Sequence, residues 1–346
     1  MKLIVQIPCY NEAGTLEETV ADIPKSIDGI DTIEILIIDD GSSDGTSELA
    51  RKLGVHHIIR NKRNMGLART FKKGLDHSLS LDADIIVNTD GDNQYCGADI
   101  AKLVQPIIAG TADITIGDRQ TSTIAHFSLG KKLLQRFGSW VVRRFSEVDV
   151  PDAVSGFRAI SREAAFRINI VSSFSYTIEM LIQVGKKGIA FTSVPVRTNP
   201  KTRDSRLFNS VFRFIERSGT TLLRMYSMYQ PLRVFTLIGL VIGLIGTIPM
   251  IRFLYFYLFV SGEGKIQSLV IGSAFLIVGV LTFILGLMAD LINHNRQLIE
   301  MSLEKLRHVE DAQKALLADA SARSAVVEEQ PVPEKLEESS SRQDDQ

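Results

Sequence analysis

The sequence has few of the residues that build covalent or metal-bound scaffolds. Its 346 residues include two cysteines, Cys9 and Cys96, so a disulfide framework is excluded and no CxxC pair offers a zinc site. The histidines form no HExxH or similar metal-binding spacing. The formal net charge is −1, which lacks the basic excess of a nucleic-acid-binding domain. We therefore expect no nucleic acid as a partner.

Two nucleotide-binding fingerprints and a secretion signal are also missing. No GxGxxG follows the first apolar segment, which argues against a dinucleotide cofactor, and no GxxxxGK[ST] of a P-loop NTPase is present. The apolar run Met1–Pro8 is ended by Asn11 and Glu12 before the hydrophobic region of a signal peptide can form. The head is therefore expected to stay in the cytoplasm, where free cysteines remain reduced.

Charge is absent from two long segments near the C-terminus. Residues 234–251 and 266–289 contain no charged side chain, and a stretch of ~18 helical residues at about 1.5 Å each approaches the thickness of a bilayer core. A pair of buried core helices is the alternative interpretation. Soluble helices rarely lack charge over such lengths, so we predict a helical hairpin across a membrane.

Basic residues predict the orientation of this hairpin. Between Arg197 and Arg233 the chain has eight Lys or Arg and two acidic residues. The loop between the two apolar segments has only Lys265 and Glu263, with Arg252 near the outer end of the first helix. The positive-inside rule then places the head and both termini at the cytoplasmic face of an inner membrane crossed more than once. The predicted organisation is a head over 1–206, juxtamembrane amphipathic helices over 207–232, two membrane helices within 233–292 (about 233–258 and 266–290), a cytoplasmic helix over 293–320 and a disordered tail over 321–346.

The head alternates short apolar segments with helical ones. KLIVQIP, IEILIID, VHHIIR and ADIIVNTD are typical strands, and the segments between them have helical spacing. Thr15 and Glu18 have the spacing of a capping box. Repeated strand–helix units predict an α/β fold, with a mostly parallel sheet flanked by helices. Ligands of such sheets bind beyond the carboxyl ends of the strands.

Three polar motifs follow those strands, namely PCYNE (8–12), IIDDGSSDGT (37–46) and NTDGDNQY (88–95). Asp90 and Asp92 lie on either side of Gly91, and Gln94 adds a neutral oxygen nearby. Carboxylate oxygens so placed suit Mg²⁺ or Mn²⁺. Taken alone, Asp90–Asp92 is more often a solvated turn, and Asp40 or Glu12 could equally belong to a loop or a helix cap.

Taken together, these motifs resemble those of family 2 glycosyltransferases, in order and spacing. NxG at 64–66 and VSGFRAISREA at 154–165 continue the match. With the C-terminal hairpin, the chain resembles polyprenyl-phosphate glycosyltransferases, the dolichyl-phosphate mannose synthase branch. The resemblance implies a GT-A catalytic domain, a nucleotide-sugar donor linked to UDP or GDP, Mg²⁺ or Mn²⁺ as cofactor, and a polyprenyl phosphate acceptor in the membrane.

The same resemblance implies roles for individual residues. Asp92 and Gln94 would hold the metal, Asp92, Arg119 and Lys132 would serve catalysis, and Lys132 with Arg136 would bind the lipid phosphate. Lys132 stands where the family usually has arginine, so the charge is kept without arginine's bidentate geometry. Lys201 or Arg203 would replace a second family arginine near Pro200. The residues that would bind the nucleotide-sugar are Pro8, Tyr10, Glu12, Ile38, Asp40, Asp90, Gly91, Asp92, Arg119 and Arg206.

Other interpretations remain open. A processive polysaccharide synthase shares this head, but it usually carries QxxRW and more membrane spans, and Gln135, Arg136 and Trp140 do not form that motif. A transferase with a soluble acceptor leaves the hairpin unexplained. A membrane scaffold with an inactive head would not need Asp90, Asp92 and Gln94. The amphipathic helices allow a homo-oligomer.

Overall fold

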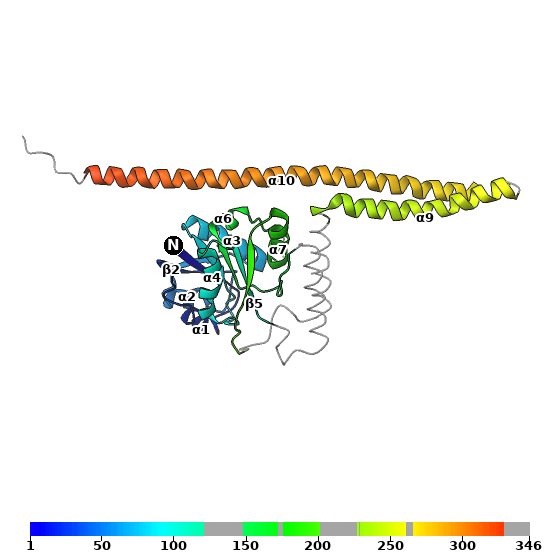
Figure 1. Cartoon of the computed structure of the whole chain (residues 1–346). Coiled ribbons are helices and arrows are strands. Elements are labelled where there is room, and N and C mark those ends of the chain that lie inside the picture. Colours follow the sequence, from blue (N-terminus) through cyan, green and yellow to red (C-terminus); the bar gives the residue numbers. More distant parts are fainter. Residues whose placement is uncertain (121–147, 172–175, 201–226, 228, 261–265, 329–346) are drawn as a thin grey trace, which may run out of the picture. The chain divides into compact units, whose positions relative to one another are not determined.

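The structure is a computed structural model that describes residues 1–120, 148–171, 176–200, 227, 229–260 and 266–328 (Figure 1). The chain divides into two compact units, Met1–Glu300 and Met301–Gln346. The first contains an α/β head, one long apolar helix and the apolar part of a second, which continues beyond Glu300.

The head is built on one seven-stranded sheet with the order β3-β2-β1-β4-β6-β5-β7. Strands β1, β2, β3 and β4 pair in parallel, and β5 pairs in parallel with β7. Only β6 among these strands is antiparallel, to β4 on one side and β5 on the other. The mostly parallel sheet expected from the sequence is confirmed. The strands are β1 (Lys2–Cys9), β2 (Thr32–Asp39), β3 (His57–Arg60), β4 (Ile85–Asn88), β5 (Ile114–Asp118), β6 (Arg158–Ser161) and β7 (Phe191–Pro195).

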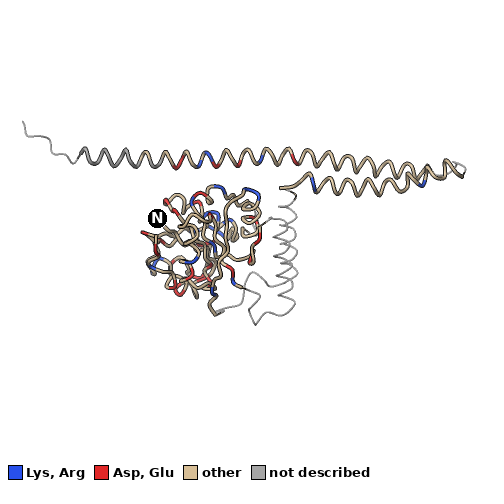
Figure 2. The backbone as a smooth tube through the Cα atoms, viewed as in Figure 1, with Lys and Arg blue, Asp and Glu red and all other residues tan. Residues whose placement is uncertain are grey.

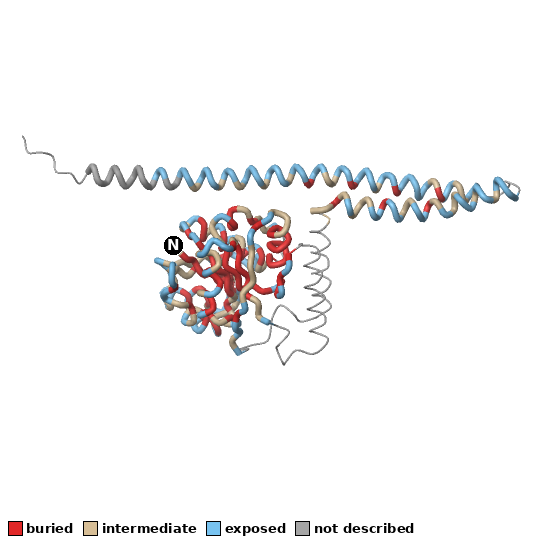
Figure 3. Tube along the Cα trace, viewed as in Figure 1, coloured by how far each residue is buried: buried red, intermediate tan, exposed pale blue. Residues whose placement is uncertain are grey.

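Helices cover both faces of the sheet. The helices described in the head are α1 (Leu16–Ala21), α2 (Thr46–Lys52), α3 (Leu67–Ser80), α4 (Ile100–Ile108), α6 (Arg162–Arg167) and α7 (Tyr176–Lys187), with a short 3₁₀ turn, η1 (Gly97–Asp99). One core joins the sheet to α3, α6 and α7, and the other joins it to α1, α2 and α4. Because both faces are covered, the central strands are rich in apolar residues. Figure 3 shows buried residues gathered along the sheet.

Alternation along β1 and β2 divides the side chains between these two cores. Leu3, Val5 and Ile7 pack on the α1 and α4 side, whereas Ile4 and Ile38 pack under α3. Each of these side chains is fully buried. The period of two is the geometry of a strand, and burying both sets stabilises the sheet by roughly 1.5–3 kcal/mol for each large side chain.

The two apolar segments form long helices, α9 (Pro231–Phe259) and α10 (Ile266–Glu328). Both are long and apolar enough to cross a membrane, and little of their apolar surface is buried within the protein. Figure 2 shows few charges on α9 and on the first part of α10. They are candidate membrane spans, as expected.

Glycines bring these two helices together. A Cβ on Gly246 would lie 2.8 Å from the carbonyl oxygen of Gly272, and one on Gly279 would lie 2.8 Å from that of Gly239. Side chains at these positions would separate the backbones. Small residues at such crossings are typical of helices that pack in lipid.

Two local features of the structure differ from the predictions made from the sequence. The helix expected over 293–320 is continuous with the second apolar segment and extends beyond residue 321 to Glu328. No glycine or proline lies between Leu287 and Glu328, so nothing in the sequence ends the helix. The capping box is wrong, because Thr15 makes no capping bond and donates instead to the carbonyl oxygen of Gly91 (2.8 Å).

Candidate functional site

The carboxyl ends of β1, β2, β4 and β5 meet at one edge of the sheet. Tyr10 and Glu12 follow β1, Asp39 ends β2 and Asp40 follows it, and Asp90 to Gln94 follow β4. The antiparallel β6 starts at this edge, so the segment before it, residues 152–157, enters the same region. The parallel topology therefore gathers polar segments that are far apart in sequence.

The loop after β2 is fixed by two buried carboxylates. Asp39 accepts hydrogen bonds from the Ser42 backbone and the Ser47 hydroxyl. Asp40 accepts three, from Asn61 Nδ2 (2.8 Å) and from the backbone N–H groups of residues 65 (2.8 Å) and 66 (2.9 Å). Asp40 thus anchors the loop before α3, and it retains at most one further acceptor position for a ligand.

The loop after β1 presents side chains of contrasting exposure. Tyr10 is exposed, whereas Glu12 is half-buried and its backbone N–H donates to Thr46 Oγ1 (3.0 Å). The Thr15 hydroxyl contacts both Glu12 Oε2 (3.2 Å) and the Gly91 carbonyl. Pro8 lies within β1 and is buried. The loops after β1 and β4 are thereby tied together.

Ile38 has a different environment from the expected one. Its side chain is fully buried under α3, where it lies close to Gly74. The side chain therefore belongs to the core, and only its backbone is placed to face a ligand at the edge. Ile38 aligns with Pro8 across the β1–β2 pair.

The loop after β4 brings two carboxylates close together. Burial and the neighbouring Asp92 raise the pKa of Asp90 to about 7, although Arg119 acts in the opposite direction. Asp92 Oδ1 accepts a hydrogen bond from the Gln94 backbone (3.3 Å). A Cβ on Gly91 would lie 2.9 Å from Cys9 Sγ, so glycine is needed for this loop to close on β1.

The oxygen atoms of Asp92 and Gln94 suit a hard divalent cation. Burial is the main cause of the raised pKa of Asp90, and repulsion from the carboxylates of Asp92 and Glu12 adds to it. A bound cation would relieve that repulsion. Gln94 is exposed and Asp92 is half-buried, so ligands from solvent can reach both. The residues present therefore fit Mg²⁺ or Mn²⁺.

Arg119, directly after β5, forms a buried bidentate ion pair. Its Nε lies 2.7 Å from Asp152 Oδ2 and its Nη2 lies 3.0 Å from Asp152 Oδ1. Burial opposes the charge, but Tyr95 and Asp152 hold the pKa of Arg119 above its ordinary value. The pair fixes the guanidinium beside Asp90.

The first residue of β6 has a structural role that the sequence did not reveal. Arg158 is fully buried and donates hydrogen bonds to the carbonyl oxygens of Ala153 (3.0 Å), Ser155 (2.9 Å) and Thr177 (3.0 Å). It therefore shapes the loop that carries Asp152. Gly156 completes the approach, since a Cβ there would lie 3.0 Å from Asp90 Oδ1.

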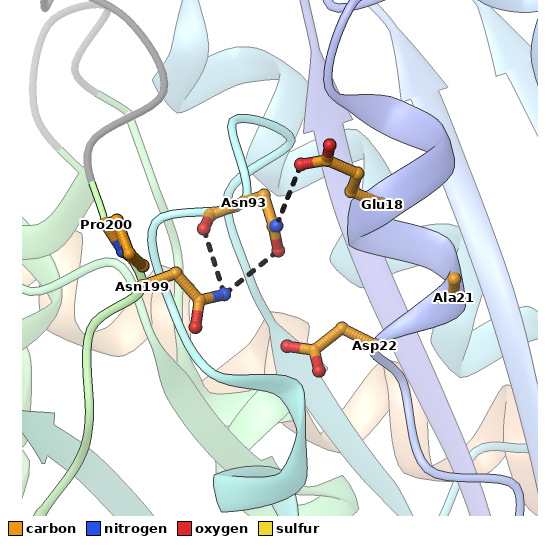
Figure 4. A pocket seen from close by; sticks show the side chains of 6 residues that line it. All are labelled: Glu18, Ala21, Asp22, Asn93, Asn199 and Pro200. Carbon is orange, nitrogen blue, oxygen red and sulfur yellow. Dashed lines mark hydrogen bonds between the residues drawn. The ribbon is translucent and has the colours of Figure 1, made fainter.

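Asn199, after β7, fastens the far side of the same loop. Its amide donates to the carbonyl oxygens of Asn93 and Tyr95 (3.2 Å each), and its backbone N–H donates to that of Gln94 (2.9 Å). Figure 4 shows Asn199 and Asn93 beside an open hollow of about 570 Å³, which Glu18, Ala21, Asp22 and Pro200 also line. Sequence reasoning missed Asn199 because its contacts lie 104 and 106 residues away.

Several predicted residues lie outside the described residues. These are Lys132 and Arg136, expected at the lipid phosphate, and Lys201, Arg203 and Arg206, expected at the diphosphate. The structure brings together the other predicted donor-site residues at or next to the sheet edge, with the Ile38 side chain turned into the core.

The sequence of the head is similar to that of a known protein family. Residues 4–167 match the model of glycosyl transferase family 2. The head therefore contains a glycosyl transferase family 2 domain. The matched residues include the loops after β1, β2, β4 and β5 and extend through α6. The family assignment and the sheet topology agree on a GT-A-like fold.

Individual relatives differ in how much of the chain they share. Glycosyltransferase AglJ of Haloferax volcanii is 28% identical over 88% of this chain and 96% of its own length. Dolichol-phosphate mannosyltransferase of Pyrococcus furiosus is 31% identical over 53% of each chain. A solved glucosyl-3-phosphoglycerate synthase of Mycobacterium tuberculosis, in complex with Mn²⁺, UDP and phosphoglyceric acid, is 18% identical over 64% of this chain and 78% of that one, with a TM-score of 0.49.

Proposed function

We propose that the chain transfers a sugar from a UDP- or GDP-linked donor to a polyprenyl phosphate, giving a polyprenyl-phosphate-sugar and the nucleoside diphosphate. The observation that carries the proposal is the cluster of Asp90, Asp92 and Gln94 beside the Arg119–Asp152 pair. The apolar hairpin of α9 and α10 and the name of the Pyrococcus relative support a lipid acceptor.

The donor half of the proposed site lies over β1, β2 and β4. Exposed Tyr10 can cover the base or ribose, and the Glu12 carboxylate can accept a hydrogen bond from a ribose hydroxyl. Asp40 has already committed most of its acceptor capacity to the loop before α3. We therefore assign Asp40 chiefly to shaping the nucleotide pocket, with at most one bond to the base.

Charge builds up on the departing nucleoside diphosphate during transfer. A divalent cation held by Asp92 and Gln94 would supply electrostatic stabilisation of that charge. Arg119, held in place by Asp152, is a fixed positive charge on the same side. A charge positioned before the reaction stabilises the transition state without reorganisation, which is the larger part of many enzymatic accelerations.

The acceptor needs positioning rather than deprotonation, because a phosphate monoester carries about −1.5 to −2 charge at pH 7. Lys132 and Arg136 are proposed to hold it, and Arg206 to neutralise the donor diphosphate. Attack on the anomeric carbon from the face opposite the leaving diphosphate inverts that centre. A hairpin in the membrane would keep the head near the lipid phosphate and raise its effective concentration.

The membrane placement is part of the proposal. We infer that α9 and the first part of α10 cross the cytoplasmic membrane and that the head and both termini lie on its cytoplasmic side. Arg233 at the start of α9 continues the basic segment that begins at Arg197. Positive charge of this kind is retained on the cytoplasmic side.

The test is transfer of label from a panel of radiolabelled UDP- and GDP-sugars into organic-extractable lipid. Membranes containing the chain are assayed with added polyprenyl phosphate and Mg²⁺ or Mn²⁺. We expect a labelled lipid product from one donor, dependent on both the lipid and the metal. Label in polymer or in a soluble product would instead support a polysaccharide synthase or a soluble acceptor. Absence of product from every donor, with folded protein, would favour a non-catalytic scaffold.

A further inference from the structure

The C-terminal half of α10 carries an apolar stripe that the proposed reaction does not use. Ile299, Leu306, Val309 and Leu316 are exposed, at 68%, 53%, 61% and 71% respectively. They lie on one unbroken helix that extends to Glu328. Four large apolar side chains exposed at these spacings call for a partner.

Their spacing is that of a coiled-coil heptad. With Ile299 at position a, the a series continues through Leu306 and Gln313, and the d series is Ser302, Val309 and Leu316. The outermost position, f, is occupied by acidic residues, Glu304 and Asp311. Ser302 and Gln313 interrupt the a/d series, and exposed Leu303 and Leu317 at position e widen the apolar stripe beside it.

The charged residues beside the apolar seam favour a second copy of this chain as the partner. In a parallel pair in register, Lys305 at position g faces Glu310 at position e of the next heptad in the other helix. A second copy of this chain thus supplies two opposite-charge pairs, one on each side of the apolar seam. We propose that residues 299–316 of α10 associate with the same segment of a second copy as a parallel coiled coil.

Topology favours the parallel arrangement. The segment directly continues the apolar part of α10, so under the membrane placement proposed above two copies enter it in the same direction. Confinement to one membrane raises the effective concentration of short segments that would pair weakly in solution. The association itself does not depend on sugar transfer, and its tests are independent of that activity.

Cysteine cross-linking tests the register. Ser302→Cys and Leu316→Cys are placed near the two ends of the d series in full-length protein carrying Cys96→Ser. Buried Cys9 is retained. We expect rapid disulfide dimers for both variants in membranes and slow formation for the outer-face control, Asp311→Cys. Equal rates at the three positions, no dimer at any, or cross-linking at Val309→Cys without the two end positions would overturn the parallel pairing.

Charge reversal tests the partner. Lys305→Glu would place like charges opposite Glu310 and lower the dimer association constant by roughly threefold to tenfold, as expected for two exposed pairs. Adding Glu310→Lys restores opposite charges across the seam and should restore the dimer. Failure of the double variant to recover, in protein with unchanged helical circular dichroism, would contradict a contact between two copies in this register.

Discussion

The sheet edge and the helical hairpin use the same residue types in opposite ways. In the head, Leu3 and Ile4 are fully buried and glycines such as Gly91 make room for polar loops. In the hairpin, the apolar side chains of α9 and α10 are mostly exposed, and Gly246 and Gly279 make room for another helix backbone. The head satisfies its apolar surface internally, whereas the hairpin requires an apolar surrounding such as a bilayer.

The two regions also differ in how many charged residues they contain. The edge concentrates buried Asp152 beside partly exposed Asp90, Asp92 and Arg119, while α9 and the first part of α10 are nearly free of charge. Changes at the edge should therefore affect catalysis or head stability without disturbing the hairpin. Changes at the helix crossing should do the reverse.

The largest expected effect is at the proposed metal ligand. Asp92→Ala should lower sugar transfer at least about 1000-fold, or ~4 kcal/mol, because the charge on the leaving diphosphate is no longer offset. The melting temperature of the head should stay within a few degrees of the unchanged protein. Asp28→Ala, on an exposed loop, is the control and should keep full activity. Full activity of Asp92→Ala would remove the metal assignment.

A large effect on both activity and stability is expected at the buried ion pair. Asp152→Asn leaves Arg119 without its buried carboxylate, which typically costs about 3–5 kcal/mol. Chemical denaturation of the full chain in detergent, monitored by far-UV circular dichroism, measures the loss of unfolding free energy. Unchanged stability together with unchanged transfer would show that Asp152 neither holds Arg119 nor supports the edge.

The helix crossing should respond to volume at one glycine and not at its neighbour. Gly246→Leu places a side chain against the Gly272 carbonyl and should cost about 1–3 kcal/mol, whereas a Cβ on Gly243 meets nothing within 4 Å. The readout is the fraction of protein that stays monodisperse in detergent after heating, with Gly243→Leu as the matched control. Equal losses for the two variants would contradict the close crossing seen here.

A gain of stability that depends on pH is expected at Asp90. The pKa of Asp90 is about 7 in the folded head and near 3.8 in the unfolded chain, chiefly because of burial and then Asp92. As pH rises from about 4 to 7, the unfolded chain loses a proton that the folded head keeps, so stability falls over this range. Asn has no charge to bury. Without metal, Asp90→Asn should therefore melt a few degrees higher than the unchanged protein at pH 8. At pH 4 the two proteins should melt at the same temperature. An identical difference at the two pH values would be inconsistent with this cause.

The fold was largely predictable because its signals are local. Apolar runs such as KLIVQIP and the turn residues after them identify the parallel strands and the edge where polar loops gather. The antiparallel β6 was not predictable from its residues, since strand direction depends on the path of the chain. The sequence has no helix breaker near residue 293, so the continuous helix α10 was predictable. The prediction of a separate helix from residue 293 did not take this into account.

The site was predictable only where its residues form a contiguous motif. DGDNQ reveals Asp92 and Gln94, but Asp152 lies 33 residues from Arg119, and Asn199 contacts residues more than 100 positions away. Such partners meet only when the sheet is assembled. Thr15 illustrates the same point, since its hydroxyl bonds to Gly91 rather than to its own helix.

The most direct test of the account is calorimetric binding of UDP and GDP to the full chain in detergent, with and without Mn²⁺, for the unchanged protein and for Asp92→Ala. The account predicts binding of one nucleotide to the unchanged protein that strengthens at least tenfold with Mn²⁺, and no metal effect in the variant. Binding of equal strength with and without metal, or identical behaviour of the two proteins, would contradict the claim that this edge of the sheet holds a nucleotide through a metal at Asp92.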